Sequence, residues 1–385
     1  MIETPVRPLA LALGGATAMA AAMGIGRFLY TPLLPSMVEA LGLTKGEAGL
    51  IASANFAGYL AGALAAAAIS AVPGGARRWL LVALAASALS TGAMGLAAST
   101  PAFLALRFIG GVASAVTLVF ASSLVLDRLA AAGRGGLSAA HFAGVGAGIA
   151  LSAVLTAALD GVGADWRAMW FGGGAVSLLA LAVTAALIPE ARASAAPSAV
   201  ATRASTGPGL WALAVAYGLF GFGYVITATF IVAIVRGPGA IAGAETAIWL
   251  VVGLAAMPSV AVWTLVGRRI GLTRAFALAS VVEAIGVAAS VAWGGVVGLG
   301  VSAVLLGGTF VGLTALGLMA ARTLAAGDAR RRLAAMTAAF GVGQIVGPIV
   351  AGYGHDMTGS FLVPSMLAAA GLCLGAALVL ATYRA

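Results

Sequence analysis

The chain has 385 residues, of which 62% are hydrophobic and 8% are charged, and its mean hydropathy is +1.11. A soluble protein of this length could not solvate such a surface, so we expect most of the chain to lie in a lipid bilayer. The formal charge of +9 does not indicate nucleic-acid binding, because the charges fall in short loops between apolar runs. The single cysteine, Cys373, excludes a disulfide framework and a cysteine-based metal site.

The apolar runs have the length of transmembrane helices. About 20 helical residues cross the hydrocarbon core of a bilayer, and runs this long are too long for barrel strands. The first run carries Arg27 and lacks a cleavage site, which favours a membrane span over a signal peptide. The sequence predicts twelve spans, at 9–36, 47–71, 78–98, 101–126, 137–159, 167–188, 210–235, 244–266, 273–293, 296–320, 333–354 and 361–382.

The longest polar interruption divides these spans six and six. It covers residues 189–208 and is rich in Pro, Ala, Ser and Thr, as a flexible linker is. We therefore predict an all-α integral membrane protein of twelve transmembrane helices in two pseudo-symmetric six-helix bundles. The predicted bundles are residues 1–188 and 209–385.

The basic residues predict the orientation in the membrane. If the N-terminus is cytoplasmic, the loops and termini on that side hold fifteen arginines, and the opposite loops hold only Lys45, Arg167 and Arg236. Such an asymmetry is typical of the cytoplasmic side of membrane proteins. We expect a multi-pass protein of the bacterial inner membrane, surrounded by lipid, with both termini in the cytoplasm.

A guanidinium lies deep in the first apolar run. Residues 24–28 read Gly-Ile-Gly-Arg-Phe, and a charge at the depth of Arg27 must face protein or a water-filled cavity rather than lipid. Residues 221–224 read Gly-Phe-Gly-Tyr, and alignment of the two stretches places Tyr224 where Arg27 stood. The glycines at 144–146 likewise match those at 341–343. Repeated halves with polar groups on facing helices predict a secondary transporter with one site between the halves.

These motifs carry a family resemblance. The twelve-span plan, with Arg107 and Gly111 in the fourth span, resembles the major facilitator superfamily. More closely, the chain is similar to its YbfB/YjiJ-type branch. That likeness is carried by residues 24–28 with Pro32 and Pro35, and by 55–59, 141–146 and 221–224. The resemblance covers essentially the whole chain and implies a major facilitator fold and transport by alternating access.

A second resemblance concerns the chemistry at Arg27. From Arg27 to residues 42–47 the spacing resembles the anion:cation symporter branch of the same superfamily, in which a first-span arginine binds organic anions. The resemblance therefore implies anion binding by Arg27, and a guanidinium offers a two-pronged donor suited to carboxylate or phosphate. The alternative is a structural role, with Arg27 held by backbone carbonyls or by an acid at the rim.

The candidate substrate site consists of polar side chains on helices expected to line the seam between the bundles. Asn55 and Tyr59 are four residues apart and therefore share one helix face. The predicted substrate-binding residues are Arg27, Tyr30, Asn55, Tyr59, Tyr224, Thr227 and Gln344.

Three ionisable residues within the spans are candidates for coupling or gating. Arg107 either takes part in proton coupling, as the resemblance implies, or holds neighbouring carbonyls. His141 either titrates in the inner vestibule or packs between helices with a bond to a loop carbonyl. Glu283 has the chemistry of a proton carrier, but in the family plan its helix lies away from the cavity. We expect it to be a neutral acid bonded to a neighbouring helix.

The sequence contains no constellation typical of an enzyme. Lys45 is the only lysine, and the two histidines fall on opposite sides of the membrane, so we expect no cofactor, no metal site and no enzymatic activity. The sequence predicts a monomeric secondary active transporter of a small solute, an organic anion, driven by protons or by the solute's own gradient. Efflux of a drug or amphiphile is the alternative within this class, and a transporter-like membrane sensor is the alternative outside it.

Overall fold

The computed structural model describes residues 7–69, 75–190, 208–236, 243–323 and 329–383, and these residues are almost entirely helical. Twelve helical segments are long and apolar enough to cross a membrane, as the sequence predicts. Lipid offers no hydrogen-bond partners, so each span satisfies its backbone internally. The first span is composite and contains α1 (Pro8–Met19), the π-helix η1 (Ala20–Ile25) and α2 (Tyr30–Leu41). The others are α3 (Lys45–Ile69), α4 (Ala76–Ala93), α5 (Thr100–Ala131), α6 (Ser138–Asp160), α7 (Trp166–Leu187), α8 (Pro208–Val235), α9 (Ala244–Ile270), α10 (Leu272–Ala292), α11 (Gly295–Thr323), α12 (Ala329–Thr358) and α13 (Leu362–Thr382).

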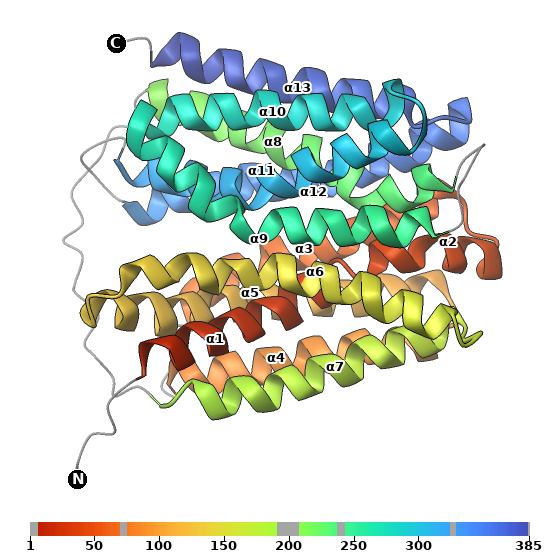
Figure 1. The fold of residues 1–385 in the computed structure, drawn as a ribbon, viewed down its shortest axis with the longest axis horizontal. Helices are drawn as coiled ribbons and strands as arrows, with labels where there is room; N and C mark the ends of the chain where they lie inside the picture. Colours follow the sequence, from red (N-terminus) through yellow and green to blue (C-terminus); the bar gives the residue numbers. More distant parts are fainter. Residues whose placement is uncertain (1–6, 70–74, 191–207, 237–242, 324–328, 384–385) are drawn as a thin grey trace.

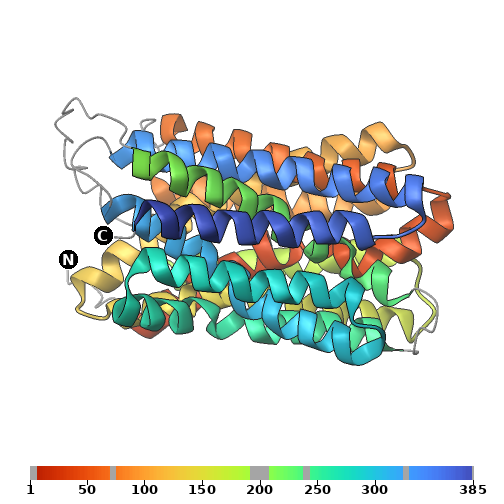
Figure 2. The same cartoon turned by 90° about the horizontal axis from the view of Figure 1, so that it is seen from above.

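The helices form two groups that lie side by side (Figure 1). Helices α1 to α7, the N-half, make up one group, and α8 to α13, the C-half, make up the other. All run roughly along the long axis of the molecule, as the view from above also shows (Figure 2). Helix α1 begins and α13 ends at the same end of the molecule, which we call the terminal end; the other is the far end. Most of the predicted linker, residues 191–207, lies outside the described residues.

Equivalent helices pack in the same way in the two halves, but in a different register from the one that the sequence repeat suggests. A Cβ on Gly144 of α6 would lie 2.0 Å from the carbonyl oxygen of Ala16 in α1. In the C-half, a Cβ on Gly343 of α12 would lie 2.1 Å from the carbonyl oxygen of Gly218 in α8. Packing therefore pairs Gly144 with Gly343 and Ala16 with Gly218. The alignment of residues 24–28 with 221–224 rested on glycine spacing alone. The helix contacts give a different pairing of α1 with α8, in which Tyr224 is not the structural counterpart of Arg27.

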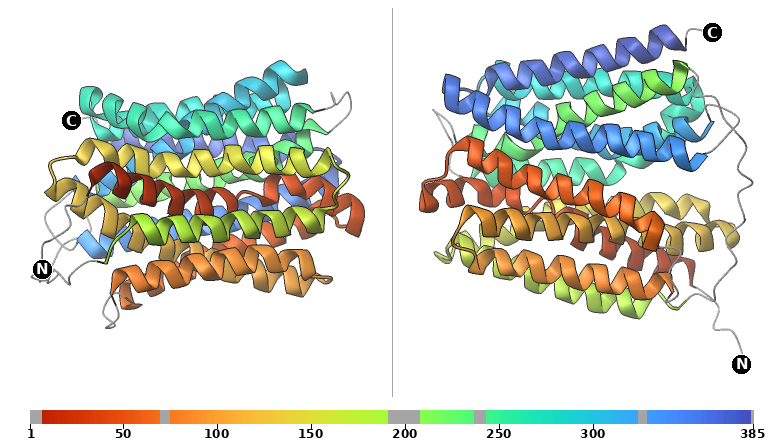
Figure 3. Two further views of the ribbon diagram at one scale, coloured as in Figure 1. Left: turned by 60° about the horizontal axis from the view of Figure 1, so that its bottom comes forward. Right: turned by 180° about the vertical axis from the view of Figure 1, so that it is seen from behind.

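The two halves meet along α3 and α12, along α6 and α9, and along α2 and α8. Figure 3, right, shows α3 lying against α12. The backbones of α6 and α9 come close enough that a Cβ on Gly146 would lie 2.5 Å from the carbonyl oxygen of Gly253. Small residues allow such close approach between membrane helices. Side-chain donors form hydrogen bonds across this seam, including those from Thr31 to the carbonyl of Ala228 (2.8 Å), from Ser53 to the carbonyl of Ile345 (2.7 Å) and from Trp249 Nε1 to Ser152 Oγ (3.0 Å).

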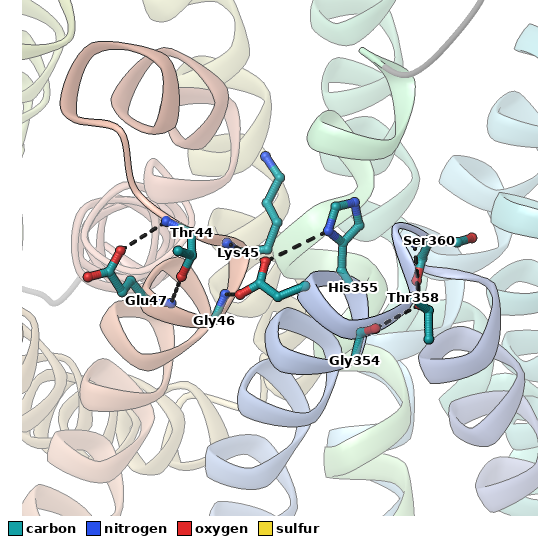
Figure 4. A network of polar contacts seen from close by, with 9 residues as sticks. Thr44, Lys45, Gly46, Glu47, Gly354, His355, Thr358 and Ser360 are labelled. Carbon is teal, nitrogen blue, oxygen red and sulfur yellow. Dashed lines mark hydrogen bonds and ion pairs between the residues drawn. The ribbon is translucent and has the colours of Figure 1, made fainter.

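A carboxylate of one half caps a helix of the other at the far end. The backbone N–H groups of Lys45 and Gly46, at the start of α3, donate to Asp356 of α12 at 3.0 and 2.7 Å (Figure 4). A carboxylate at a helix N-terminus satisfies unpaired donors and complements the helix dipole. Thr44 and Glu47 form a capping box, with reciprocal bonds of 2.9 and 3.1 Å within the N-half. Asp356 therefore joins the halves, whereas Glu47 stabilises only its own helix.

We predict that Asp356→Ala weakens closure at the far end. Loss of an N-cap costs about 1 kcal/mol, so the share of molecules open at this end should rise by roughly fivefold. The measurement is thiol labelling of a cysteine introduced at Ala228, which is 4% exposed, in a Cys373→Ser background. Glu47→Ala is the matched control, because it removes a cap within one half and should leave labelling unchanged. Equal labelling of the two variants would refute the role of Asp356.

Candidate functional site

The first span is interrupted at the depth of Arg27. The π-helix over Ala20–Ile25 includes a bond from the Gly26 N–H to the Ala21 carbonyl at 2.8 Å, and a turn at residues 26–29 precedes α2. Single-turn π segments interrupt the regular ladder and occur frequently at functional sites. The irregular turn at residues 26–29 lies just before Pro32, which cannot donate to the carbonyl of Phe28.

Arg107 of α5 stabilises this interruption. Its two terminal nitrogens donate to the carbonyl oxygens of Gly26 (3.0 Å) and Arg27 (3.1 Å). Its own backbone carbonyl accepts a bond of 2.9 Å from Asn55 Nδ2, and its guanidinium carbon lies 5.1 Å from the centre of the Tyr30 ring. Of the two predicted roles, holding neighbouring carbonyls therefore matches the geometry. Arg107 positions the residues around the break, including Arg27.

Two other predicted substrate ligands belong to this supporting cluster rather than to the seam. The Tyr30 hydroxyl donates to the carbonyl of Ala48 at 2.9 Å, and its ring stacks on Trp170 at 6.5 Å. Asn55 is fully buried beside Arg107, and its Oδ1 has no partner among the described residues. Asn55 and Arg107 line a small cavity inside the N-half, with room for about one water molecule.

Arg27 is a buried cation with free donor atoms. It is 3% exposed, and its guanidinium carbon lies 4.1 Å from the centre of the Tyr59 ring and 5.3 Å from that of Phe56. Its Nε and Nη2 atoms have no hydrogen-bond partner, and no acid forms an ion pair with it, among the residues that the structure describes. Because a buried charge is costly without a partner, Arg27 is a candidate for binding an anionic ligand.

Tyr224 of α8 brings the C-half to this charge. Its hydroxyl accepts a hydrogen bond from Gln344 Nε2 of α12, and it interacts electrostatically with Arg27 across the seam. Its ring lies nearly parallel to those of Phe310 (8°) and Phe340 (6°), with centroids 5.6 and 6.0 Å away. Four of the seven predicted substrate residues therefore gather at the seam: Arg27, Tyr59, Tyr224 and Gln344. Thr227 is fully buried on the same helix, and its hydroxyl has no partner among the described residues.

The aromatic rings of the seam include residues that sequence reasoning missed. Phe28 contacts Trp249 (6.2 Å between ring centres) and Phe310 (5.8 Å), so it joins the two halves directly. The sequence did not indicate Phe310 and Phe340 as residues of the site. Nothing in their local sequence distinguishes them from lipid-facing or packing phenylalanines.

His141 lies away from the seam, between α1, α5 and α6. It is fully buried, and its Nε2 lies 3.2 Å from Ser122 Oγ of α5. A Cβ on Gly15 would lie 2.4 Å from the ring, so the imidazole fills the space that this glycine leaves. The contacts match the predicted packing role, but the partner is a helix hydroxyl rather than a loop carbonyl.

The side chain of Glu283 points into the interior of the C-half, although its helix, α10, lies at the side of that half. It is fully buried, and neither carboxylate oxygen has a hydrogen-bond partner among the described residues. The neighbouring Thr309 of α11 donates its hydroxyl to the carbonyls of Leu305 (2.6 Å) and Leu306 (3.2 Å). Thr309 belongs to a neighbouring helix and interacts with the acid, so the expected bond from Glu283 to a neighbouring helix stays a prediction.

Comparison with known proteins identifies the family. Residues 19–380 match the family model described as uncharacterised MFS-type transporter YbfB. The chain belongs to this family. It is thus a multi-pass membrane transporter of the major facilitator superfamily, not an enzyme, and the resemblance drawn from the sequence motifs is confirmed. No curated protein matches the sequence.

Solved structures of other transporters share the fold of this YbfB-family chain. A mutant of the nucleoside transporter NupG superposes with a TM-score of 0.76 at 15% identity, over 97% of this chain and 100% of NupG. A bacterial homologue of the human lysosomal transporter Spinster, in an inward-facing and occupied conformation, gives a TM-score of 0.70 at 14% identity. That match covers 100% of this chain and 98% of the homologue. At such identities the likeness establishes the major facilitator fold and nothing about the substrate.

We predict that Arg107→Ala destabilises the protein, because two buried carbonyls lose a charged donor. The expected loss is roughly 2–4 kcal/mol, seen as a lower thermal unfolding midpoint in detergent. Arg78→Ala is the control, since Arg78 is exposed at the start of α4 and its loss should change stability by less than about 0.5 kcal/mol. Similar midpoints for the two variants would contradict the supporting role of Arg107.

Proposed function

We propose that this transporter carries a small organic anion across the inner membrane by symport with protons, and that the anion binds at Arg27 between the two halves. The observation that carries the proposal is the buried guanidinium whose Nε and Nη2 have no partner among the described residues. A carboxylate or phosphate oxygen supplies what these donors lack, and charge-assisted hydrogen bonds are the stronger kind.

The seam provides the remaining contacts for such a ligand. Tyr59 and Phe56 lie against the guanidinium on the N-half side. Tyr224, with Gln344, faces it from the C-half. Because the ligand would contact both halves, its binding would depend on how they are placed relative to each other. A carrier needs that dependence for alternating access.

The two ends of the molecule would open in turn. The hydrogen bonds between described residues of the two halves, including the Asp356 cap, lie from the middle of the bundle to the far end. We assign the terminal end to the cytoplasm on the positive-inside rule, and this makes the described conformation closed to the outside. Release to the other side requires the Asp356 cap and the α6–α9 contact to separate. We propose that the carrier acts as a monomer.

Export of a hydrophobic amphiphile is the second candidate. Phe28, Trp249 and Phe310 form an apolar group at the seam, and such a group would suit a molecule without a fixed negative charge. In this case Arg27 would be structural, held by its contact with the Tyr59 ring. The two candidates differ in whether transport needs the charge of residue 27.

We predict that Arg27→Ala abolishes anion transport without unfolding the protein. Two lost charge-assisted bonds should weaken anion binding by at least about tenfold. The measurement is counterflow of labelled lactate, succinate and benzoate in proteoliposomes, with thermal unfolding as the test of folding. Arg134→Ala, which removes an exposed arginine from a loop at the terminal end, is the charge-matched control and should transport normally.

Other probes separate the alternatives in the same vesicles. Tetraphenylphosphonium represents a hydrophobic cation, and uridine represents a neutral solute, because one structural neighbour is a nucleoside transporter. Transport of tetraphenylphosphonium or uridine with no carboxylate flux would reject the anion proposal. Carboxylate flux that survives Arg27→Ala would reject Arg27 as the binding residue. Binding without flux of any probe would indicate a sensor.

A further inference from the structure

Glu283 is the charged residue that the site at Arg27 does not explain. It lies midway along α10, is fully buried, and has no hydrogen-bond partner on either oxygen among the described residues. Buried polar groups almost always have partners, so one without any calls for a physical reason. An ionisable group at membrane depth is by default a functional residue.

The helices around Glu283 offer no cation to neutralise it. Helices α8 and α13 contain no charged residue, and those of α9 and α11 (Glu245, Arg268, Arg269 and Arg322) lie near the helix ends. Two uncharged groups interact with the acid, Thr309 from α11 and Tyr224 from α8. Arg274, on α10 itself, lies in the first turn of the helix. Among the described residues, no basic side chain forms an ion pair with Glu283.

Aromatic residues connect the surroundings of the two oppositely charged groups. The ring of Tyr224 stacks on Phe310 of α11, and Phe310 contacts Phe28, the residue that follows Arg27. Phe310 directly follows Thr309 along α11. Thr309, Phe310 and Tyr224 therefore link the surroundings of the acid to those of the guanidinium within an apolar interior, where screening by water is weak and charges act over longer distances.

We propose that Glu283 is the proton-binding residue of the transporter, electrostatically coupled through Tyr224 to the anion site at Arg27. This inference rests on the proposed function, since it assumes that an anion binds at Arg27. The proton comes from the aqueous phase on the side where the anion binds, adds to a Glu283 carboxylate oxygen, and leaves to the aqueous phase on the other side. No other bond forms or breaks.

Charge neutrality sets the coupling. In the empty carrier, ionised Glu283 balances Arg27. The charge of the second buried guanidinium, Arg107, is stabilised by the carbonyls of Gly26 and Arg27 and does not change during the cycle. With an anion bound at Arg27, neutrality requires Glu283 to be protonated. The two remaining combinations, anion alone or proton alone, leave an uncompensated charge at the seam, and such a charge is costly in the apolar interior. Only the empty and the doubly loaded carrier therefore change sides readily.

Two consequences are measurable. One proton accompanies each monovalent anion, so transport carries no net charge and does not respond to an imposed membrane potential. Removal of the titratable group leaves Arg27 unbalanced in the empty carrier, which then cannot return. Exchange of anion for anion does not use the empty carrier, because the anion itself balances Arg27 in both directions.

The transport test compares wild type, Glu283→Gln and the control Glu39→Gln, which changes an exposed acid at the end of α2. The probe is labelled lactate in proteoliposomes. A pH gradient should drive accumulation in wild type and in Glu39→Gln, with no effect of a potassium diffusion potential. Glu283→Gln should lose accumulation but retain lactate counterflow.

The outcomes separate this inference from the proposed function. Accumulation retained by Glu283→Gln, or wild-type accumulation that follows the potential instead of the pH gradient, would overturn the role of Glu283. Both results leave the anion site at Arg27 standing, provided counterflow depends on that residue. Absence of lactate counterflow in wild type together with transport of tetraphenylphosphonium would overturn the proposed function and this inference with it.

A second measurement needs no substrate. The infrared spectrum of a protonated carboxylic acid contains a carbonyl stretch that ionised carboxylates lack. Purified wild type should show such a band, which disappears on raising the pH and is absent from Glu283→Gln but present in Glu39→Gln. A Glu283 band that persists over the whole pH range in which the protein is folded would identify a permanently neutral, structural acid and overturn the proposal.

Discussion

The structure depends on one electrostatic constraint, which is that a permanent positive charge lies at the centre of an apolar protein. Arg27 is buried at the seam of the two halves with free donor atoms and no acid paired to it among the described residues. Guanidinium groups do not give up their charge in proteins. A bound anion or, in the empty carrier of the proposed cycle, ionised Glu283 must therefore balance it, while the ring of Tyr59 stabilises it weakly.

The surroundings of Arg27 are arranged to keep it in place without neutralising it. Arg107 binds the carbonyls of Gly26 and Arg27 through its two terminal nitrogens, so a second guanidinium fixes the backbone at Arg27. The ring of Tyr59 lies against the charge and stabilises it weakly. Tyr224 and Gln344 approach from the other half. This arrangement holds a cation whose strongest partner is still missing.

The sequence predicts the fold well because the composition and the lengths of the apolar runs determine the number of membrane spans. Twelve spans, two halves and the family follow from hydrophobic runs and a few motifs, and the structure and the family match confirm the fold class and the family. The residue-by-residue alignment of the two halves could not be predicted from the sequence, because similar glycine spacings recur along membrane helices. Only the contacts of Gly144 with Ala16 and of Gly343 with Gly218 define it. The direction of Glu283 was equally hidden, since helix position does not determine which face of the helix meets the interior.

The site could be predicted from the sequence only where a residue type is unusual at membrane depth. Charged residues at membrane depth, such as Arg27 and Arg107, stand out in the hydropathy of the sequence, whereas Phe310 and Phe340 become notable only beside Tyr224.

The position of a bound anion tests most directly whether Arg27 is the binding residue. Crystals soaked in 4-bromobenzoate should give a bromine anomalous peak at the seam, with the carboxylate on Arg27 and the ring near Tyr59 and Tyr224. A ligand bound elsewhere, or an Arg27 guanidinium saturated by protein carbonyls with no ligand beside it, would contradict the account.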